Sequence, residues 1–347
     1  MAGRQVFVLG AGFTRAFYPK APLMIDDYGG ADLIDRFKRF TGAKLMIESE
    51  IQRNDKGSIN IERMMTRLES PMPYDDFGRA QEHSLLLVEL NRAFLARLAK
   101  AKTGDNYEDD LSRLAIFCVN REIDCITFNY DDFLDQKLYG VANGETRVDV
   151  PHWHPDGGYG FFCRPADTTV EESPVYMERN SMHLLKLHGS MNWRAIRGRA
   201  RPYSVDAIVH LENWYTYASR RLEEPPSVQE IESHLNPEPL IIPPVLVKSA
   251  LSEQLWLSIV WSKAFGSLRE ADKVTFIGYS LPDTDIAAAF LFGEAIRPDT
   301  QIEVVSYSID GAHQDELARP YLLLFPWLSM KAFDFRGALA WCRDVVA

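Results

Sequence analysis

The sequence has few cysteines and no long apolar segment. No two of its four cysteines have the C-x-x-C spacing of a zinc ribbon or a redox centre. Scattered cysteines of this kind are typical of a reducing compartment, so we expect a cytoplasmic location. No uninterrupted apolar run reaches the ~18 residues that a membrane-spanning helix needs. The cysteines are Cys118, Cys125, Cys163 and Cys342.

Basic residues are also in deficit, with 38 Lys and Arg against 49 Asp and Glu, for a formal net charge of −11. Excess negative charge weakens attraction to nucleic-acid phosphates and to anionic membrane surfaces. We therefore expect no direct nucleic-acid binding and no membrane association. With 46% hydrophobic and 25% charged residues, the composition is that of a globular protein whose core needs no covalent staples.

Five apolar segments have the pattern of strands that are buried on both faces of a parallel sheet. They alternate with segments of helical periodicity, which predicts an α/β fold with a doubly wound, Rossmann-like parallel sheet. A short apolar segment between prolines, residues 239–243, is compatible with an edge strand. The five segments are residues 6–9, 123–128, 182–187, 274–277 and 301–305.

We interpret residues 1–347 as one domain that carries three insertions. Residues 20–110 have helical periodicity and are predicted to form a large helical insertion. Residues 141–181 are rich in glycine, proline and aromatic residues, and residues 194–238 contain a double proline with a tyrosine and tryptophan cluster. Both of these stretches are predicted to be irregular insertions.

A glycine-rich turn follows the first expected strand and opens a helix-compatible run. Glycine lets a backbone approach a phosphate closely, and a helix N-terminus offers N–H groups to it. The dinucleotide fingerprint would place a third glycine at Arg15. The turn alone is therefore also compatible with a tight strand-to-helix connection that binds nothing. Its residues are Gly10-Ala11-Gly12-Phe13-Thr14.

Polar side chains follow the second and third expected strands at their carboxyl ends, where open α/β sheets bind ligands. Asn129 comes after the second strand and His188 after the third. We take His188 as a candidate general base, because an imidazole titrates near neutral pH. Asp131 is either a site residue or the cap of the next helix. His183 lies within its strand and is expected to point away from the ligand edge.

The fourth motif follows the expected strand of residues 274–277. Ser280 offers a hydroxyl, and Asp283 or Asp285 offers a carboxylate, to a ribose. The same residues are equally compatible with a Pro-Asp turn in which Asp285 caps the following helix.

Taken in order, the four motifs resemble those of the sirtuin superfamily, which run Gly-Ala-Gly-x-Ser, Thr-Gln-Asn-x-Asp, His-Gly and a late Gly-x-Ser. The late segment Ile-Gly-Tyr-Ser-Leu-Pro-x-x-Asp and the apolar segment 239–244 resemble a bacterial sirtuin-like family more closely. The resemblance extends from residue 5 to about residue 310. The matching segments are residues 10–14, 127–131, 188–189 and 278–280.

The resemblance implies NAD as the substrate and cleavage of its nicotinamide–ribose bond through an oxocarbenium-like transition state. It implies that Asn129 orients the attacking water and the ribose hydroxyls, and that His188 is the base for that water or for a ribose hydroxyl. It also implies that Asp131 steadies the ribose or supports the developing positive charge. The pyrophosphate would be held by Gly10, Ala11, Gly12, Phe13 and Thr14, and the adenosine half by Gly278, Tyr279, Ser280 and Asp283.

The sequence departs from the sirtuin pattern in ways that bear on the reaction. It lacks the two cysteine pairs of the sirtuin zinc ribbon and the Pro-Asp-Phe-Arg segment, and Thr14 replaces serine. We therefore expect no metal, and we expect water as the acceptor, which gives nicotinamide and ADP-ribose. In the bacterial family such NAD+ hydrolases are anti-phage defence effectors. The resemblance thus implies a homo-oligomer or a defence partner protein as the activator, with residues 20–110 as the contact surface.

Three alternatives stay open at this point. An NAD-dependent protein deacylase would require an acyl-lysine peptide, and the missing cysteine pairs argue against it. A non-catalytic module that senses NAD or ADP-ribose would not need His188. A Rossmann oxidoreductase would show an acidic residue about 20 positions after the glycine turn, and Asp32 has this spacing but lies where no second strand is expected. Attack by a ribose hydroxyl, to give a cyclised product, is also compatible with the motifs.

Overall fold

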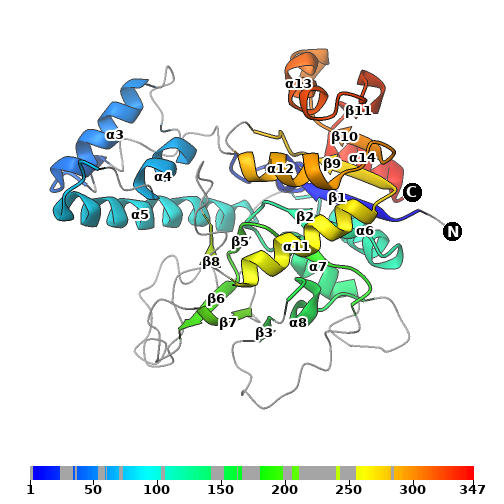
Figure 1. Cartoon of the computed structure of the whole chain (residues 1–347), viewed down its shortest axis with the longest axis horizontal. Coiled ribbons are helices and arrows are strands. Elements are labelled where there is room, and N and C mark those ends of the chain that lie inside the picture. The colour runs from blue at the N-terminus through cyan, green and yellow to red at the C-terminus, as the bar shows by residue number, and fades with distance from the viewer. Residues whose placement is uncertain are drawn as a thin grey trace.

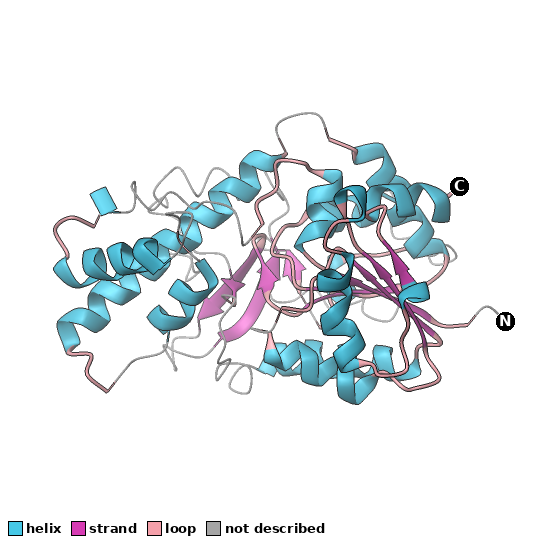
Figure 2. Ribbon diagram, turned by 90° about the horizontal axis from the view of Figure 1, so that it is seen from above, coloured by secondary structure: helices cyan, strands magenta, loops and turns pink. Residues whose placement is uncertain are grey.

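The computed structural model places a parallel β-sheet between two layers of helices, with a group of further helices at one side (Figures 1 and 2). No helix in the part of the chain that it describes has the length and apolar character needed to cross a membrane. The structure describes residues 3–23, 34–35, 37–53, 59, 61–69, 73–102, 106–141, 152–161, 163–165, 180–197, 205–210, 240–242, 255–282 and 285–347.

The central sheet has six strands within the described residues, and all its neighbouring pairs are parallel. From β4 to β11 the strands follow the chain order 3-2-1-4-5-6, which is the Rossmann order. The predicted doubly wound fold is confirmed. The strand order reverses between β1 and β9. The strands are β1 (Gln5–Leu9), β2 (Asp124–Thr127), β4 (Leu184–Lys186), β9 (Lys273–Ile277), β10 (Gln301–Val305) and β11 (Phe333–Asp334).

All five predicted core strands are present, and the structure adds one that the sequence did not indicate. That strand, β11, has two half-buried residues and therefore no apolar run to mark it. The predicted edge strand in residues 239–243 corresponds to β8 (Leu240–Ile241). It does not extend the main sheet but pairs antiparallel with β5 (Gly189–Ser190), directly after His188.

The helices that cover the sheet form two groups. On one side α1, α6 and α14 contact one another and α7 packs on α6, while on the other side α11 contacts α12 and α13 packs with α12 around Phe276. Because both faces are covered, the central strands are almost wholly apolar. The helices are α1 (Ala11–Phe17), α6 (Glu108–Asn120), α7 (Phe133–Val141), α11 (Leu255–Glu270), α12 (Ile286–Ala295), α13 (Gln314–Leu324) and α14 (Ala338–Val345).

A second hydrophobic cluster lies among the helices at the side of the sheet (Figure 1). These helices are α3 (Thr41–Arg53), α4 (Ile61–Glu69) and α5 (Phe77–Ala101), and α5 contacts both of the others. The cluster also includes Tyr130 and Met191, which flank the ends of β2 and β5. The helical segment therefore packs against residues at the carboxyl edge of the sheet.

Smaller elements occupy the other two predicted insertions. Residues 194–238 were predicted to be irregular. The described residues among them instead form most of β6 and all of β7, which pair antiparallel. Apolar and polar residues do not alternate strictly in residues 194–197 and 205–210, so the sequence pattern does not mark strands there. The remaining elements are α8 (Pro155–Gly158), β3 (Arg164–Pro165), β6 (Trp193–Arg197), β7 (Val205–His210) and the 3-10 turns η2 (Ile309–Gly311) and η3 (Met330–Ala332).

Two glycine turns meet where the strand order reverses. The N–H of Gly12 donates to the carbonyl of Gly278 at 2.9 Å, so the start of α1 is bonded to the end of β9. Gly278 has φ +60, and a Cβ there would lie 2.1 Å from the amide nitrogen of Phe13. A side chain at this position would force the two turns apart. Glycine is thus required by packing between backbones, independently of any ligand.

We expect Gly278→Ala to lower the free energy of unfolding by about 2–5 kcal/mol, since it adds both a clash and a strained φ. Gly266→Ala is the matched control, because a Cβ at this position in α11 meets nothing within 4 Å. That control should raise the free energy of unfolding by about 0.5–1 kcal/mol. Denaturant titration of the two variants measures both values, and equal stabilities would contradict the close approach of the two turns.

Candidate functional site

The four motifs lie side by side at one edge of the sheet. They follow β9, β1, β2 and β4, which are consecutive neighbours, and parallel strands end at a common edge. The structure therefore brings together the glycine turn, Asn129, His188 and the Gly278 turn. Asp283 lies outside the described residues.

The glycine turn is held mostly by its own backbone. Besides the bond from Gly12 to Gly278, the N–H of Phe13 donates to the carbonyl of Gly10 at 2.9 Å. The ring of Phe13 is buried against Phe17, with 5.0 Å between centroids. Ala11 is exposed at the start of α1, so the turn faces outward at this residue.

Asn129 is fixed to the glycine turn by its side chain. Its Nδ2 donates to the carbonyl of Gly10 at 2.8 Å and to Oγ1 of Thr14 at 2.9 Å. Its own amide N–H donates to Oγ1 of Thr127 at 3.1 Å. Its Oδ1 has no hydrogen-bond partner among the described residues, and the side chain is half-buried. One acceptor atom of Asn129 is thus available for a ligand, with its direction set by two hydrogen bonds.

Asp131 is buried behind this contact. Its Oδ2 accepts from Oγ1 of Thr14 at 2.7 Å, and its Oδ1 accepts from the N–H of Phe133 at the start of α7. Burial raises the pKa of Asp131, against the opposing charge of Lys186. The carboxylate acts as a helix cap and as a bridge to Thr14. A contact between Asp131 and a ribose remains a prediction.

His188 is buried among aromatic rings. The rings of His188 and Phe128 are T-shaped, with 5.1 Å between their centroids, and the ring of Tyr130 lies 6.1 Å away. Its Nε2 lies 3.9 Å from Oδ2 of Asp285. The carbonyl of His188 accepts from the N–H of Ile242 at 2.8 Å, so β8 helps to hold its backbone.

The turn after β9 contributes Tyr279 rather than Ser280 to this cluster. Tyr279 stacks on Phe128 at 4.7 Å, while Ser280 is exposed. The hydroxyl of Tyr279 donates to Oδ2 of Asp285 at 3.1 Å. Asp285 stands at the N-cap of α12 but makes no capping hydrogen bond with its side chain within the described residues. The sequence is compatible with Asp285 either as a ribose ligand or as a helix cap. No pattern in the sequence indicates its contact with His188.

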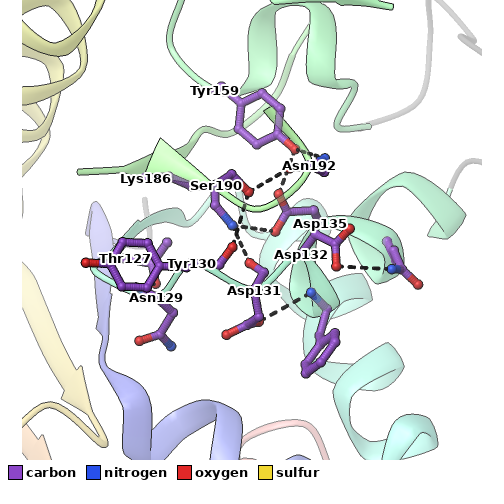
Figure 3. A network of polar contacts seen from close by, with 12 residues as sticks. Thr127, Asn129, Tyr130, Asp131, Asp132, Asp135, Tyr159, Lys186, Ser190 and Asn192 are labelled. Atoms are coloured by element: carbon purple, nitrogen blue, oxygen red, sulfur yellow. Dashed lines mark hydrogen bonds and ion pairs between the residues drawn. The ribbon is translucent and has the colours of Figure 1, made fainter. Parts of the chain in front are cut away.

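A buried polar network lies behind Asn129 and Asp131 (Figure 3). Lys186, only 1% exposed, donates to the carbonyl of Asp131 and lies 3.2 Å from Oδ2 of Asp135. The hydroxyl of Tyr159 donates to Oδ1 of Asp135 at 2.6 Å. The network has no signal in the sequence, because Lys186 lies in an otherwise apolar strand and its partners lie more than 50 residues from it in the sequence.

The network continues to the strand after His188. Nδ2 of Asn192 donates to the hydroxyl oxygen of Tyr159 at 3.4 Å, and Ser190 donates to Oδ1 of Asn192 at 2.6 Å. Buried polar groups that satisfy one another in this way hold a unique arrangement of their elements. The network therefore fixes β4, α7 and β5 relative to one another beneath the site.

Asp132 is a buried carboxyl group in the same region. It is fully buried; its Oδ1 accepts from Gln136 at 3.3 Å, and its Oδ2 has no hydrogen-bond partner among the described residues. Burial and the neighbouring charge of Asp135, opposed by Lys186, raise the pKa of Asp132 to about 7.

His183 lies at the amino end of β4, away from the site, as its position in the strand predicts. Its N–H donates to Oδ1 of Asp124 at 2.8 Å. Although burial opposes it, hydrogen bonds from His183 and Ser267 lower the pKa of Asp124 to about 2. His183 thus belongs to an ion-pair network at the opposite edge of the sheet.

The four cysteines are all buried, and Sγ of Cys118 lies 4.0 Å from Sγ of Cys125. Over the described ranges, no three or more His, Cys, Asp or Glu side chains are grouped so that they could hold a metal ion.

No protein-family model matches the chain. No curated protein matches it either. Among solved structures, a Sir2 homologue in complex with NAD aligns with a TM-score of 0.47 at 10% identity, over 99% of this chain and 91% of the other. A structure on the mechanism and regulation of Sir2 enzymes (TM-score 0.37, 12% identity) and one on sirtuin substrate affinity (0.38, 14%) align over the same shares.

The raised pKa of Asp132 predicts a pH dependence of stability. An unfolded Asp titrates near pH ~3.9, whereas Asp132 in the folded chain titrates at about 7. Between these values the native state keeps a proton that the unfolded chain has released, so stability falls as pH rises. Relative to Asp132→Asn, the wild type should lose about 1.4 kcal/mol of unfolding free energy per pH unit within this window.

Asp110→Asn is the control for this measurement. The hydrogen bond from Arg343 lowers the pKa of Asp110, so its contribution is lost only as pH falls below the ordinary range of an Asp. The difference between wild type and this control should be flat between about pH 5 and pH 7. A flat difference for Asp132→Asn as well, in urea titrations at several pH values, would show that Asp132 is ionised throughout.

Proposed function

We propose that the chain is a sirtuin-like NAD+ hydrolase, which cleaves the nicotinamide–ribose bond and releases nicotinamide and ADP-ribose. The observation that carries the proposal is the convergence of the Gly10 turn, Asn129 and His188 at the carboxyl edge of the sheet. They lie beside the point where a Rossmann-order sheet reverses, and open α/β sheets bind nucleotides at that point. The order of the same residues in the sequence matches the sirtuin motifs.

The geometry supports distinct roles for the two side chains. Asn129 is immobilised by Gly10 and Thr14, and its remaining oxygen can accept from a water molecule or a ribose hydroxyl. His188 would take the proton from that hydroxyl or water as the new bond to the ribose carbon forms. Nicotinamide departs as a neutral molecule, so the leaving group needs no acid. The catalytic contribution is thus orientation and one proton transfer.

Water as the acceptor is supported by the sequence. The paired cysteines of the sirtuin zinc module, beside which an acyl-peptide would bind, are missing from the chain. The adenosine half of NAD would then lie toward the Gly278 turn, where the exposed Ser280 offers a hydroxyl. The pyrophosphate would lie at Ala11 and Gly12, at the start of α1.

Control by assembly or by a partner is part of the proposal, as is a role in anti-phage defence. Tyr130 gives this part of the proposal its structural support. Its side chain belongs to the hydrophobic cluster of α3, α4 and α5, and its ring also lies beside the ring of His188. A protein bound to those helices would thereby act on a residue of the site. The helical segment is accordingly proposed as the contact surface.

We expect the purified protein to release nicotinamide from NAD without any acyl-lysine peptide and without forming NADH. His188→Ala should lower the rate at least about 100-fold, because it removes the base. Asn129→Ala should lower it about 100-fold, because the attacking group is no longer oriented. Chromatography of nicotinamide, ADP-ribose, cyclised product and NADH separates the possible reactions.

His183→Ala is the matched histidine control, and it should keep the wild-type rate because His183 lies at the other edge of the sheet. The assay is run over a range of protein concentrations, and also in cells by following NAD during phage infection. Absence of nicotinamide release in all of these settings, or equal rates in the wild type and His188→Ala, would refute the hydrolase proposal.

A further inference from the structure

Asp285 is placed to act on His188, although 97 positions separate the two in the sequence. Both side chains are buried, and Oδ2 of Asp285 lies 3.9 Å from Nε2 of His188. The same oxygen accepts from the hydroxyl of Tyr279 at 3.1 Å. A buried carboxylate is costly unless it is hydrogen-bonded or paired with positive charge.

The surrounding side chains hold this arrangement in place. Phe128 contacts the His188 ring edge-on and stacks on Tyr279, so it fills the space between the two. The backbone carbonyl of Tyr279 accepts from Tyr321 on α13 at 2.6 Å. The position of Asp285 is therefore set by α12, by the turn after β9 and by an aromatic cluster, rather than by solvent.

We propose that Asp285 is a positioning residue for His188. Its carboxylate, held by Tyr279, turns Nε2 of the imidazole toward itself, so that Nδ1 is the nitrogen that takes the proton. The proton then leaves the attacking water or ribose hydroxyl, and the ring becomes a cation that the carboxylate stabilises. Asp285 itself stays ionised and touches no substrate. The catalytic part of this inference rests on the proposed function, whereas the contact with His188 does not.

The separation of 3.9 Å fits this role. It is within ion-pair distance for a charged imidazolium, and hydrogen bonds of catalytic groups tend to be long before the substrate binds. Two tyrosines of the described residues also lie in this cluster: Tyr130, after β2, beside the ring, and Tyr279, after β9, bonded to Asp285. Neither is a carboxylate, and both are kept in an Asp285→Asn variant.

The direct test is an NMR titration of histidine ring protons in the wild type and in Asp285→Asn, with His188→Ala to assign the signal. Removal of a neighbouring negative charge disfavours the cationic ring. The midpoint of the His188 titration should therefore move to lower pH in Asp285→Asn and stay unchanged in Asp110→Asn. An unchanged midpoint in Asp285→Asn would overturn the proposal, whether or not the protein is active.

Kinetics give the second test. Asp285→Asn should lower kcat for nicotinamide release by about 10- to 100-fold with KM nearly unchanged, and Asp285→Glu should recover part of the loss. Tyr279→Phe, which removes only the hydroxyl, should give a smaller loss and remains informative if Asp285→Asn does not fold.

If the wild type is inactive, the proposed function fails, and the NMR titration alone tests the contact between Asp285 and His188. If the wild type is active while kcat and the titration midpoint are unchanged in Asp285→Asn, only this inference fails.

Discussion

The hydrogen bond from the N–H of Gly12 to the carbonyl of Gly278 is the contact on which the site depends. It joins the turns after β1 and β9, the two strands between which the order of the sheet reverses. The bond forms only because both residues lack a Cβ, since either Cβ would lie within 3.0 Å of the opposite backbone. This contact sets where α1 begins, and hence where Thr14 meets Asn129.

From this fixed point the site divides into a polar half and an aromatic half. The polar half runs from the Gly10 turn through Asn129, Thr14 and Asp131 to Lys186, and each step is a hydrogen bond. The aromatic half holds His188 against Phe128, Tyr130 and Tyr279, with Asp285 as the charged group. The polar half thus presents one acceptor of fixed direction, Oδ1 of Asn129, and the aromatic half holds a buried imidazole.

The sequence was sufficient for the parts of the fold that depend on local patterns. Strands buried on both faces are continuous apolar runs, so five of the six core strands were predictable, as was the meeting of their polar ends at one edge. The last strand, Phe333–Asp334, is too short to have a pattern. Asp285 and Lys186 were not predictable as site neighbours, because their partners come from other elements and only the packing of those elements brings them together. Tyr130 likewise gave no sign that it links the helical cluster to His188.

We propose that this sheet edge binds NAD with its nicotinamide ribose between Asn129 and residue 188. A crystal structure of the His188→Ala variant soaked with NAD tests it most directly, because loss of the base keeps the substrate intact. We expect density for the pyrophosphate at Ala11 and Gly12, and a ribose hydroxyl within hydrogen-bond distance of Oδ1 of Asn129. NAD bound elsewhere, or no density for NAD at this sheet edge at saturating NAD, would contradict the proposed binding site.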